Sequence, residues 1–213
     1  TNAYAADRMV IDLSGDGRYD ANWQDAFFTS PMQALLKNIP IYPTWGNHEQ
    51  SGSGATYTEA ATNHYNNYFR LPQDPALTNG NQFYYSFDYG GIHFSSINTN
   101  DAFTPGSAQY DWLVEDLRAN AGKTWRIVYF HHPPYTSGYH APETILENVR
   151  QYLVPVFETY DVKWVLSGHD HSYQRSVKDG VNYVIPGGAS QEKDINVYTN
   201  IYQVYAEKTF NFA

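Results

Sequence analysis

Short apolar runs that end in polar turns recur along this chain. Four of them are rich in Val, Ile, Tyr and Trp and share this layout: 8–16, 39–49, 125–132 and 162–171. Apolar runs of this length and composition predict buried β-strands. Two further runs, at 90–98 and 181–188, predict strands that lack a turn with metal-ligand side chains.

Apolar residues at helical spacing occupy the segments between these runs. Residues 107–121 predict a helix with Ser107 as its N-cap, because Ser oxygen accepts from the free N–H groups of a first turn. Residues 142–160 predict a second helix, which Pro155 is expected to end or kink. A third helix is expected over 24–38.

Strands that alternate with helices indicate an α/β fold. In open α/β sheets the carboxyl ends of parallel strands gather at one edge, where ligands bind. Each of the four polar turns follows the carboxyl end of a predicted strand. We therefore expect all four turns to meet at one edge of one sheet.

Composition narrows the class of protein. The chain has 213 residues, which fits a single domain over 1–213, and its formal net charge is −9. The absence of a basic run argues against a nucleic-acid groove, and no apolar stretch is long enough for a membrane span. Cysteine is absent, so metal ligands must be oxygen or imidazole. The 20 tyrosines favour an extracellular or secreted protein.

The polar turns carry the residue types that a pair of metal ions would bind. They offer a carboxylate, a phenol, an amide and several imidazoles: Asp16, Tyr19, Asn47, His48, His131, His132, His140, His169 and His171. A bridging carboxylate with amide and imidazole ligands suits Fe, Zn or Mn. Two such ions about 3.5–4 Å apart can polarise a phosphoryl oxygen and activate water.

Neighbouring histidines are expected to divide their roles. On an extended segment, residues two apart face the same way, so His169 and His171 can both face the site. Adjacent residues point apart, so His132 is expected to support His131 rather than to bind metal. His64 and His93 stand outside any motif and are interpreted as structural.

At this point the chain resembles the metallophosphoesterases with the calcineurin-like fold, and in particular their purple acid phosphatase branch. Four motifs of that branch are present in order: Gly15-Asp16-Gly17-Arg18-Tyr19, Gly46-Asn47-His48-Glu49, Val128-Tyr129-Phe130-His131 and Gly168-His169-Asp170-His171. The resemblance implies a layered β-sandwich flanked by helices, and it covers roughly residues 8 to 190.

The resemblance also implies a role for each residue that matches a motif. Asp16 would bridge two metals, with Tyr19 and His171 on the first, ferric, ion. Asn47 would bind the second ion, a divalent Fe, Zn or Mn, together with His131 and His169. The substrate pocket would contain His48 and His140, which hold the phosphate and protonate the leaving alkoxide.

The first motif of the branch, Asp-x-Gly, is missing. It belongs on a strand one βα unit upstream, about 30 residues long, whereas only 15 residues precede Asp16. Asp12 cannot replace it, because four residues along a strand span about 13 Å. Either the native protein is longer, which we favour, or the domain is degenerate and its first metal site is weakened. The chain after about residue 190 also fits the family poorly and is expected to be irregular.

The expected function is a phosphatase that hydrolyses small phosphate monoesters by attack of metal-bound hydroxide. One alternative is a phosphodiesterase or nucleotide hydrolase on the same scaffold, against which Tyr19 argues. The other is a non-catalytic surface or binding module that keeps the fold. A further departure is Ala141, where plant members of the branch tend to carry a second histidine, so the preferred substrate stays open.

Overall fold

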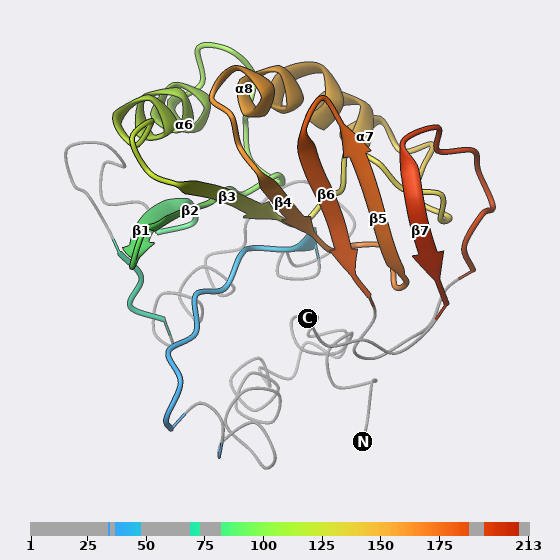
Figure 1. Cartoon of the computed structure of the whole chain (residues 1–213), viewed down its shortest axis with the longest axis horizontal. Helices are drawn as coiled ribbons and strands as arrows, with labels where there is room; N and C mark the ends of the chain where they lie inside the picture. Colours follow the sequence, from blue (N-terminus) through green and yellow to red (C-terminus); the bar gives the residue numbers. More distant parts are fainter. Residues whose placement is uncertain (1–33, 35–36, 48–68, 73–81, 188–193, 209–213) are drawn as a thin grey trace, which may run out of the picture.

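The computed structural model describes residues 34, 37–47, 69–72, 82–187 and 194–208. Within these residues, seven strands form one mixed sheet in the order β1-β2-β3-β4-β6-β5-β7 (Figure 1). The strands are β1 (Tyr85–Tyr89), β2 (Ile92–Ser96), β3 (Trp125–Phe130), β4 (Trp164–Ser167), β5 (Tyr173–Lys178), β6 (Val181–Pro186) and β7 (Gln203–Glu207). The expected α/β class is confirmed, and the expected strands at 90–98, 125–132, 162–171 and 181–188 are present.

The centre of the sheet is parallel. Strands β2, β3, β4 and β6 run in the same direction, while β1, β5 and β7 pair antiparallel at the two sides. In the register of β3 with β4, Phe130 pairs with Ser167, the last residue of each strand. The turns that follow these two strands therefore start level with each other, which places His131 beside Gly168.

Helices cover one face of the sheet (Figure 1). They are α6 (Ala108–Ala119), α7 (Thr144–Asn148), the π-helical turn η3 (Val149–Leu153) and α8 (Val154–Thr159). As predicted, Ser107 caps α6, because its hydroxyl accepts from the Tyr110 N–H at 3.4 Å. The apolar sides of these helices pack on the sheet and form the core. The helices contribute Leu113, Leu117, Val149 and Leu153, and the strands contribute Val128 and Val165.

Of the two outcomes expected at Pro155, an end or a kink, the helix does not end there. Directly before it, the Val154 N–H donates to Val149 O, five residues back, which is a π-type bond. Pro155 then lies in the first turn of α8, where a proline is tolerated because the N–H groups of a first turn make no α-type hydrogen bond. The helix therefore changes its winding and continues to Thr159.

The strand expected over 39–49 is absent from its described part, residues 39–47. Pro40 and Pro43 have no N–H to donate to a sheet ladder, and a proline disfavours a central strand. The segment is held instead by isolated side-chain hydrogen bonds: the Tyr85 hydroxyl donates to Pro43 O at 2.6 Å, and the Thr44 hydroxyl donates to Ile97 O at 3.0 Å. Near its carboxyl end, Trp45 O accepts from Asn100 Nδ2 at 3.3 Å, so the segment runs beside the residues that follow β2.

Three strands were not predicted, namely β1, β5 and β7. The buried positions of β5 are polar, Gln174 and Ser176, so its pattern of apolar residues does not reveal a buried face. Strand β5 joins β6 through Asp179 and Gly180, both at positive φ, as a tight hairpin requires. Strand β7 lies within the stretch after residue 190 and pairs with β5.

Several expectations concern residues outside the described ranges. They include the strand at 8–16 and nearly all of the helix at 24–38. The single-domain organisation over 1–213 and the missing βα unit stay predictions. None of the helices in the described part of the chain has the length and apolar character that a membrane span needs.

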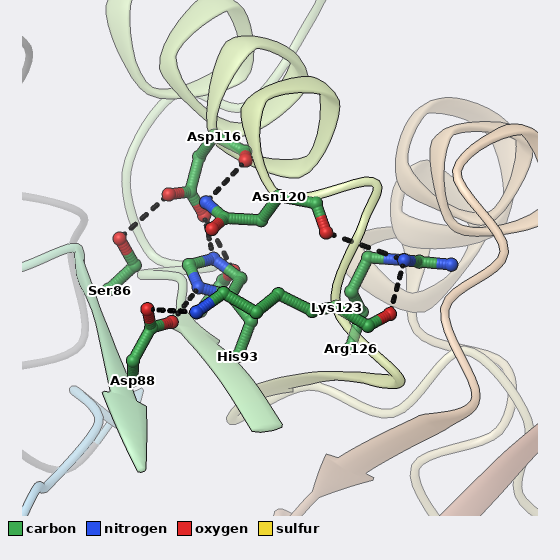
Figure 2. Close-up of polar contacts among 8 residues, drawn as sticks. Ser86, Asp88, His93, Asp116, Asn120, Lys123 and Arg126 are labelled. Atoms are coloured by element: carbon green, nitrogen blue, oxygen red, sulfur yellow. Dashed lines mark hydrogen bonds and ion pairs between the residues drawn. The ribbon is translucent and has the colours of Figure 1, made fainter. Parts of the chain in front are cut away.

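A charged network lies near the amino end of β2, at the opposite edge from the turns after β3 and β4 (Figure 2). Both ring nitrogens of buried His93 meet carboxylates, Nδ1 with Asp88 Oδ1 at 2.8 Å and Nε2 with Asp116 Oδ2 at 2.9 Å. Asp116 also accepts from the Ser86 and Ser95 hydroxyls, both at 2.7 Å. Because ionised carboxylates only accept hydrogen bonds, this geometry requires an N–H on both nitrogens and therefore a protonated His93.

The pKa values of this network agree with that geometry. Burial alone would lower the pKa of His93, but the hydrogen bonds and charges of Asp116 and Asp88 outweigh it, and the pKa is raised. The hydrogen bonds of Asp88 to Lys123 and His93 lower the pKa of its carboxyl group. His93 is thus a structural cation that joins β1, β2 and α6.

Candidate metal centre

The turns after β3 and β4 bring two histidines into direct contact. His131 Nε2 lies 3.1 Å from His169 Nδ1, and their rings meet edge to face with centroids 4.9 Å apart. The two turns are held level by the Gly168 N–H, which donates to His131 O at 2.9 Å. The expectation that these polar turns meet at one edge of the sheet is thereby confirmed for the pair that the structure describes.

Glu143 completes this arrangement and was not predicted from the sequence. Its Oε2 lies 2.9 Å from His169 Nε2, and its Oε1 lies 2.5 Å from His140 Nδ1. Since the carboxylate accepts, His169 donates through Nε2, and its Nδ1 is left as an acceptor that faces His131. A carboxylate behind a histidine in this manner is the common support of a metal ligand.

The electrostatics keep His169 neutral, which is the form that binds a metal. Burial lowers the pKa of His169 despite the opposing effect of Glu143. Burial alone would raise the pKa of Glu143, but hydrogen bonds to His140 and His169 outweigh it, so the pKa is lowered and the carboxylate stays ionised.

His132 lies closer to His131 and His169 than was expected for the residue directly after His131 on an extended segment. Its ring contacts both neighbouring histidine rings, with centroids 4.8 Å from His131 and 4.7 Å from His169. The chain leaves the strand at Phe130, so the alternation of a strand no longer holds and the two side chains do not point apart. Its Nδ1 lies 2.8 Å from the Thr99 hydroxyl, and burial lowers the pKa of His132 to about 3.

The turn that contains His169 is not extended, contrary to expectation. His169 adopts a positive φ of 69°, which is uncommon for a residue with a side chain and recurs at functional sites. Between the two histidines of the motif, Asp170 is fully buried and accepts from the Thr136 hydroxyl. This bond ties the turn after β4 to the loop that leads to His140.

The loop before His140 is fixed by buried polar contacts. Gln174 of β5 accepts from the Ser137 N–H at 2.8 Å, and the Thr136 hydroxyl accepts from the Gly138 N–H at 2.9 Å. A Cβ on Gly138 would lie 2.5 Å from Asp170 Oδ1, so any side chain here would force the buried Asp170 carboxylate to shift. The loop delivers His140 to the centre, where its ring lies against His169 with centroids 3.9 Å apart.

The remaining predicted ligands divide between described and undescribed residues. Asn47 is half-buried, and its buried Oδ1 makes no hydrogen bond within the described residues. His171 is also half-buried, but among those residues it does not join a group of three potential ligands. Asp16, Tyr19 and His48 lie outside the described ranges, so their placement stays a prediction.

The residues present fit a metal ion. Among the described residues, two groups of three potential ligands can be identified: His131, His132 and His169, and His140, Glu143 and His169. Within each group the ligand atoms lie within 4.8 Å of one another. Imidazole nitrogens bind zinc at about 2.0–2.1 Å, so two ligands of one ion can stand about 3 Å apart. The separation of 3.1 Å between His131 and His169 matches this spacing.

Comparisons with known proteins agree with this geometry. A family model described as calcineurin-like phosphoesterase matches residues 7–173. Purple acid phosphatase 23 of Arabidopsis thaliana is 33% identical over 147 residues, which are 68% of this chain and 31% of the relative. Purple acid phosphatase 15 of the same plant is 30% identical over 159 residues, 74% of this chain and 29% of the relative. The chain thus spans about a third of the length of these relatives.

Solved structures share the fold. The purple acid phosphatase PPD1 from yellow lupin (Lupinus luteus) seeds superposes with a TM-score of 0.70 at 18% identity, over 98% of this chain and 44% of that chain. PhoD superposes with a TM-score of 0.63 at 17% identity, over 90% of this chain and 49% of that chain. At these identities the likeness concerns the fold alone.

Proposed function

Because the chain belongs to the calcineurin-like phosphoesterase family, we propose that it forms part of a dinuclear-metal phosphatase that hydrolyses small phosphate monoesters. The observation that carries this proposal is the pair of facing nitrogens on His131 and His169, at the carboxyl ends of adjacent parallel strands. The likeness to purple acid phosphatases supports a monoester substrate. We further propose that the native protein is extracellular or secreted, which its 20 tyrosines favour.

In this proposal the metal ligands come from several strand ends. His131, His169 and Asn47 would hold a divalent Fe, Zn or Mn ion. Asp16 would bridge it to a ferric ion, which Tyr19 and His171 would hold. When bound, the two ions supply Lewis-acid polarisation of the phosphoryl group and a water activated for attack.

His140 is the proposed acid for the leaving group. Its Nδ1 is engaged by Glu143 at 2.5 Å, so the opposite nitrogen, Nε2, is the atom that can deliver a proton to the departing alkoxide. The His140 side chain is only partly buried, with 31% of its surface exposed, as a group that meets substrate must be. His48 is proposed as its partner on the phosphate.

Glu143 holds the proposed acid and a proposed ligand with one carboxylate. Through its two oxygens it fixes the ring of His140 and the ring of His169. A neutral His169 supported by an ionised carboxylate presents the lone pair of Nδ1 to a cation. Glu143 is therefore proposed as a positioning residue both for metal binding by His169 and for proton transfer from His140 to the leaving group.

Metal analysis and rates together test the proposal on the native full-length protein. We expect two metal ions per chain, and a rate with phenyl phosphate far above that with a diester such as bis(p-nitrophenyl) phosphate. The variant His169→Ala should lose bound metal and reduce kcat/KM by about 100-fold or more, since changes to outer-sphere groups alone cost about 10–100-fold. A protein that binds none of Fe, Zn or Mn would exclude this function, and faster diester cleavage would favour the phosphodiesterase alternative.

A further inference from the structure

A cleft of about 450 Å³ lies beside the candidate metal centre, on the other side of the segment that carries His140. Its walls come from the start of the His140 loop, from the π turn η3, and from residues 198–202. Ala141 and Pro142 line it, while the residues on either side of them, His140 and Glu143, contact His169. One short segment therefore faces the metal centre at its ends and the cleft at its middle.

Arg150 gives the cleft a positive charge. This half-buried residue of η3 donates one guanidinium hydrogen bond, from Nη1 to Pro134 O at 2.8 Å. Within the described residues it makes no other hydrogen bond, and no carboxylate lies within 4.0 Å of it. By contrast, buried Arg126 is paired with Asp161 at 3.1 Å. In a chain of net charge −9, a half-buried arginine that lines a cleft and has no carboxylate partner among the described residues is suited to bind an external anion.

Aromatic rings form the other side of the cleft. Tyr135 meets Tyr202 edge to face, with ring centroids 5.0 Å apart, and Tyr198 adds a half-exposed ring. Tyr135 is 9% exposed, and its hydroxyl makes no hydrogen bond among the described residues. Burial raises the pKa of Tyr135 to about 12, so the phenol keeps its proton and can donate it to a ligand. Rings of this kind bind planar groups by stacking and edge contacts.

The π turn supports a functional interpretation of Arg150. Turns of this type are rare in helices and are frequent at functional sites. In η3 the turn begins at Val149 and includes Arg150 as its second residue. The cleft volume also lies within the range of about 300–1,000 Å³ that is usual for small-molecule sites.

We propose that this cleft binds a planar organic anion, with its carboxylate or phosphate on Arg150 and its ring against Tyr198 and Tyr202. Such an anion has two possible sources. It can be the organic part of a phosphate ester whose phosphoryl group lies at the metal centre, or a separate molecule that binds next to it. The chemistry of recognition is the same for both.

Direct titration of the native full-length protein tests the binding step, which does not depend on the phosphatase proposal. The probe is 1-naphthoate, and the uncharged 1-naphthylmethanol is its matched control. We expect saturable binding of 1-naphthoate that weakens at least tenfold in Arg150→Gln and much less in Arg150→Lys. Arg118→Gln, which changes an exposed arginine of α6, should leave the affinity unchanged. 1-Naphthylmethanol should bind more weakly and should not respond to Arg150→Gln.

A second variant guards against a folding defect in Arg150→Gln. Tyr198→Ala removes a half-exposed ring and should weaken 1-naphthoate binding severalfold with no change in thermal midpoint. Equal affinity of 1-naphthoate for the wild type and both variants would overturn the proposal, as would a complete lack of saturable binding.

Kinetics then separate the two sources, and this arm alone rests on the proposed phosphatase function. Competitive inhibition of phenyl phosphate hydrolysis by 1-naphthoate identifies the cleft as the place of the ester's organic part. A change in kcat without a rise in KM identifies a separate ligand. If the protein has no phosphatase activity while 1-naphthoate still binds through Arg150, the proposed function fails and the binding site stands.

Discussion

A single histidine, His93, lies at the amino end of the parallel strands, and a histidine cluster lies at their carboxyl end; the two sites differ in the partners that surround the imidazoles. His93 has a carboxylate at each ring nitrogen, Asp88 and Asp116, and is held as a cation (Figure 2). His131 and His169 face each other, and the carboxylate of Glu143 lies behind His169. Two carboxylates around one imidazole favour a protonated histidine, whereas imidazoles that face each other favour neutral rings whose lone pairs can bind a cation.

The substitution His93→Gln tests the structural half of this comparison and has the largest expected effect. It removes the cation between Asp88 and Asp116 and leaves a buried carboxylate, so we expect a loss of about 3–5 kcal/mol in the free energy of unfolding. Urea denaturation measures this loss. At a temperature where the variant is folded, its metal content and kcat/KM should match the wild type. A variant as stable as the wild type would contradict the assignment of His93 as a structural cation.

The substitution Gly138→Ala tests how tightly the loop before His140 is packed against Asp170 at the candidate metal centre. The added Cβ would lie 2.5 Å from Asp170 Oδ1, and overpacking of this kind costs about 1–3 kcal/mol. We expect kcat/KM to fall together with the unfolding free energy, because the loop also carries His140. Gly122→Ala is the matched control, since nothing lies within 4 Å of its Cβ position. Full activity of Gly138→Ala would show that the loop position is not critical.

The substitution Glu143→Gln tests the carboxylate that contacts both His140 and His169. The amide can still accept one hydrogen bond but cannot hold His140 and His169 with equal strength, so metal affinity or kcat/KM should fall about 10–100-fold. Titration of the metal-free protein with Zn²⁺ separates the two effects. Glu147→Gln, in the helix α7 that directly follows Glu143, is the control and should behave like the wild type. An unchanged Zn²⁺ affinity together with an unchanged rate would remove Glu143 from the site.

The dependence of stability on pH gives the smallest effect and the sharpest test of charge. The pKa of His93 is raised in the folded protein, so its stabilisation is complete below its unfolded pKa of about 6.5 and is lost as pH rises through the folded pKa. One group contributes at most about 1.4 kcal/mol per pH unit. The difference in unfolding free energy between wild type and His93→Gln should therefore shrink as pH rises above 6.5. A difference that stays constant or grows would mean that His93 is neutral.

Sequence patterns predicted the elements in which apolar residues face the core. The strands β3 and β4 and the helix α6 with its Ser107 cap follow ordinary periodicity, and the residues after β3 and β4 were placed at the correct edge. Strand β5 was missed because its buried positions are Gln174 and Ser176. The segment 39–47 has the composition of a strand, but its two prolines prevent sheet pairing, so the predicted strand is absent.

The candidate centre was predictable only in part, for a similar reason. Motif spacing singled out His131 and His169, because each follows the end of a predicted strand, whereas His140 was expected only from the resemblance to the phosphatase branch. The role of Glu143 depends on a loop that folds back, and its only sequence signal is a position three residues after His140. The rings of His131 and His132 converge because the strand ends at Phe130, which a pattern of alternation cannot show.

The buried contacts among Thr136, Gly138, Asp170 and Gln174 have a consequence for protein engineering and for sequence evolution. These four positions come from the His140 loop, the turn after β4 and strand β5, and contacts link them: Thr136 donates to Asp170 and accepts from Gln174, and Gly138 leaves room for the Asp170 carboxylate. A graft of the loop from a relative would bring its own hydroxyl and glycine to a foreign carboxylate and amide. The four positions should therefore change together among homologues, and the unit that can be exchanged between relatives is the set of three segments rather than the loop.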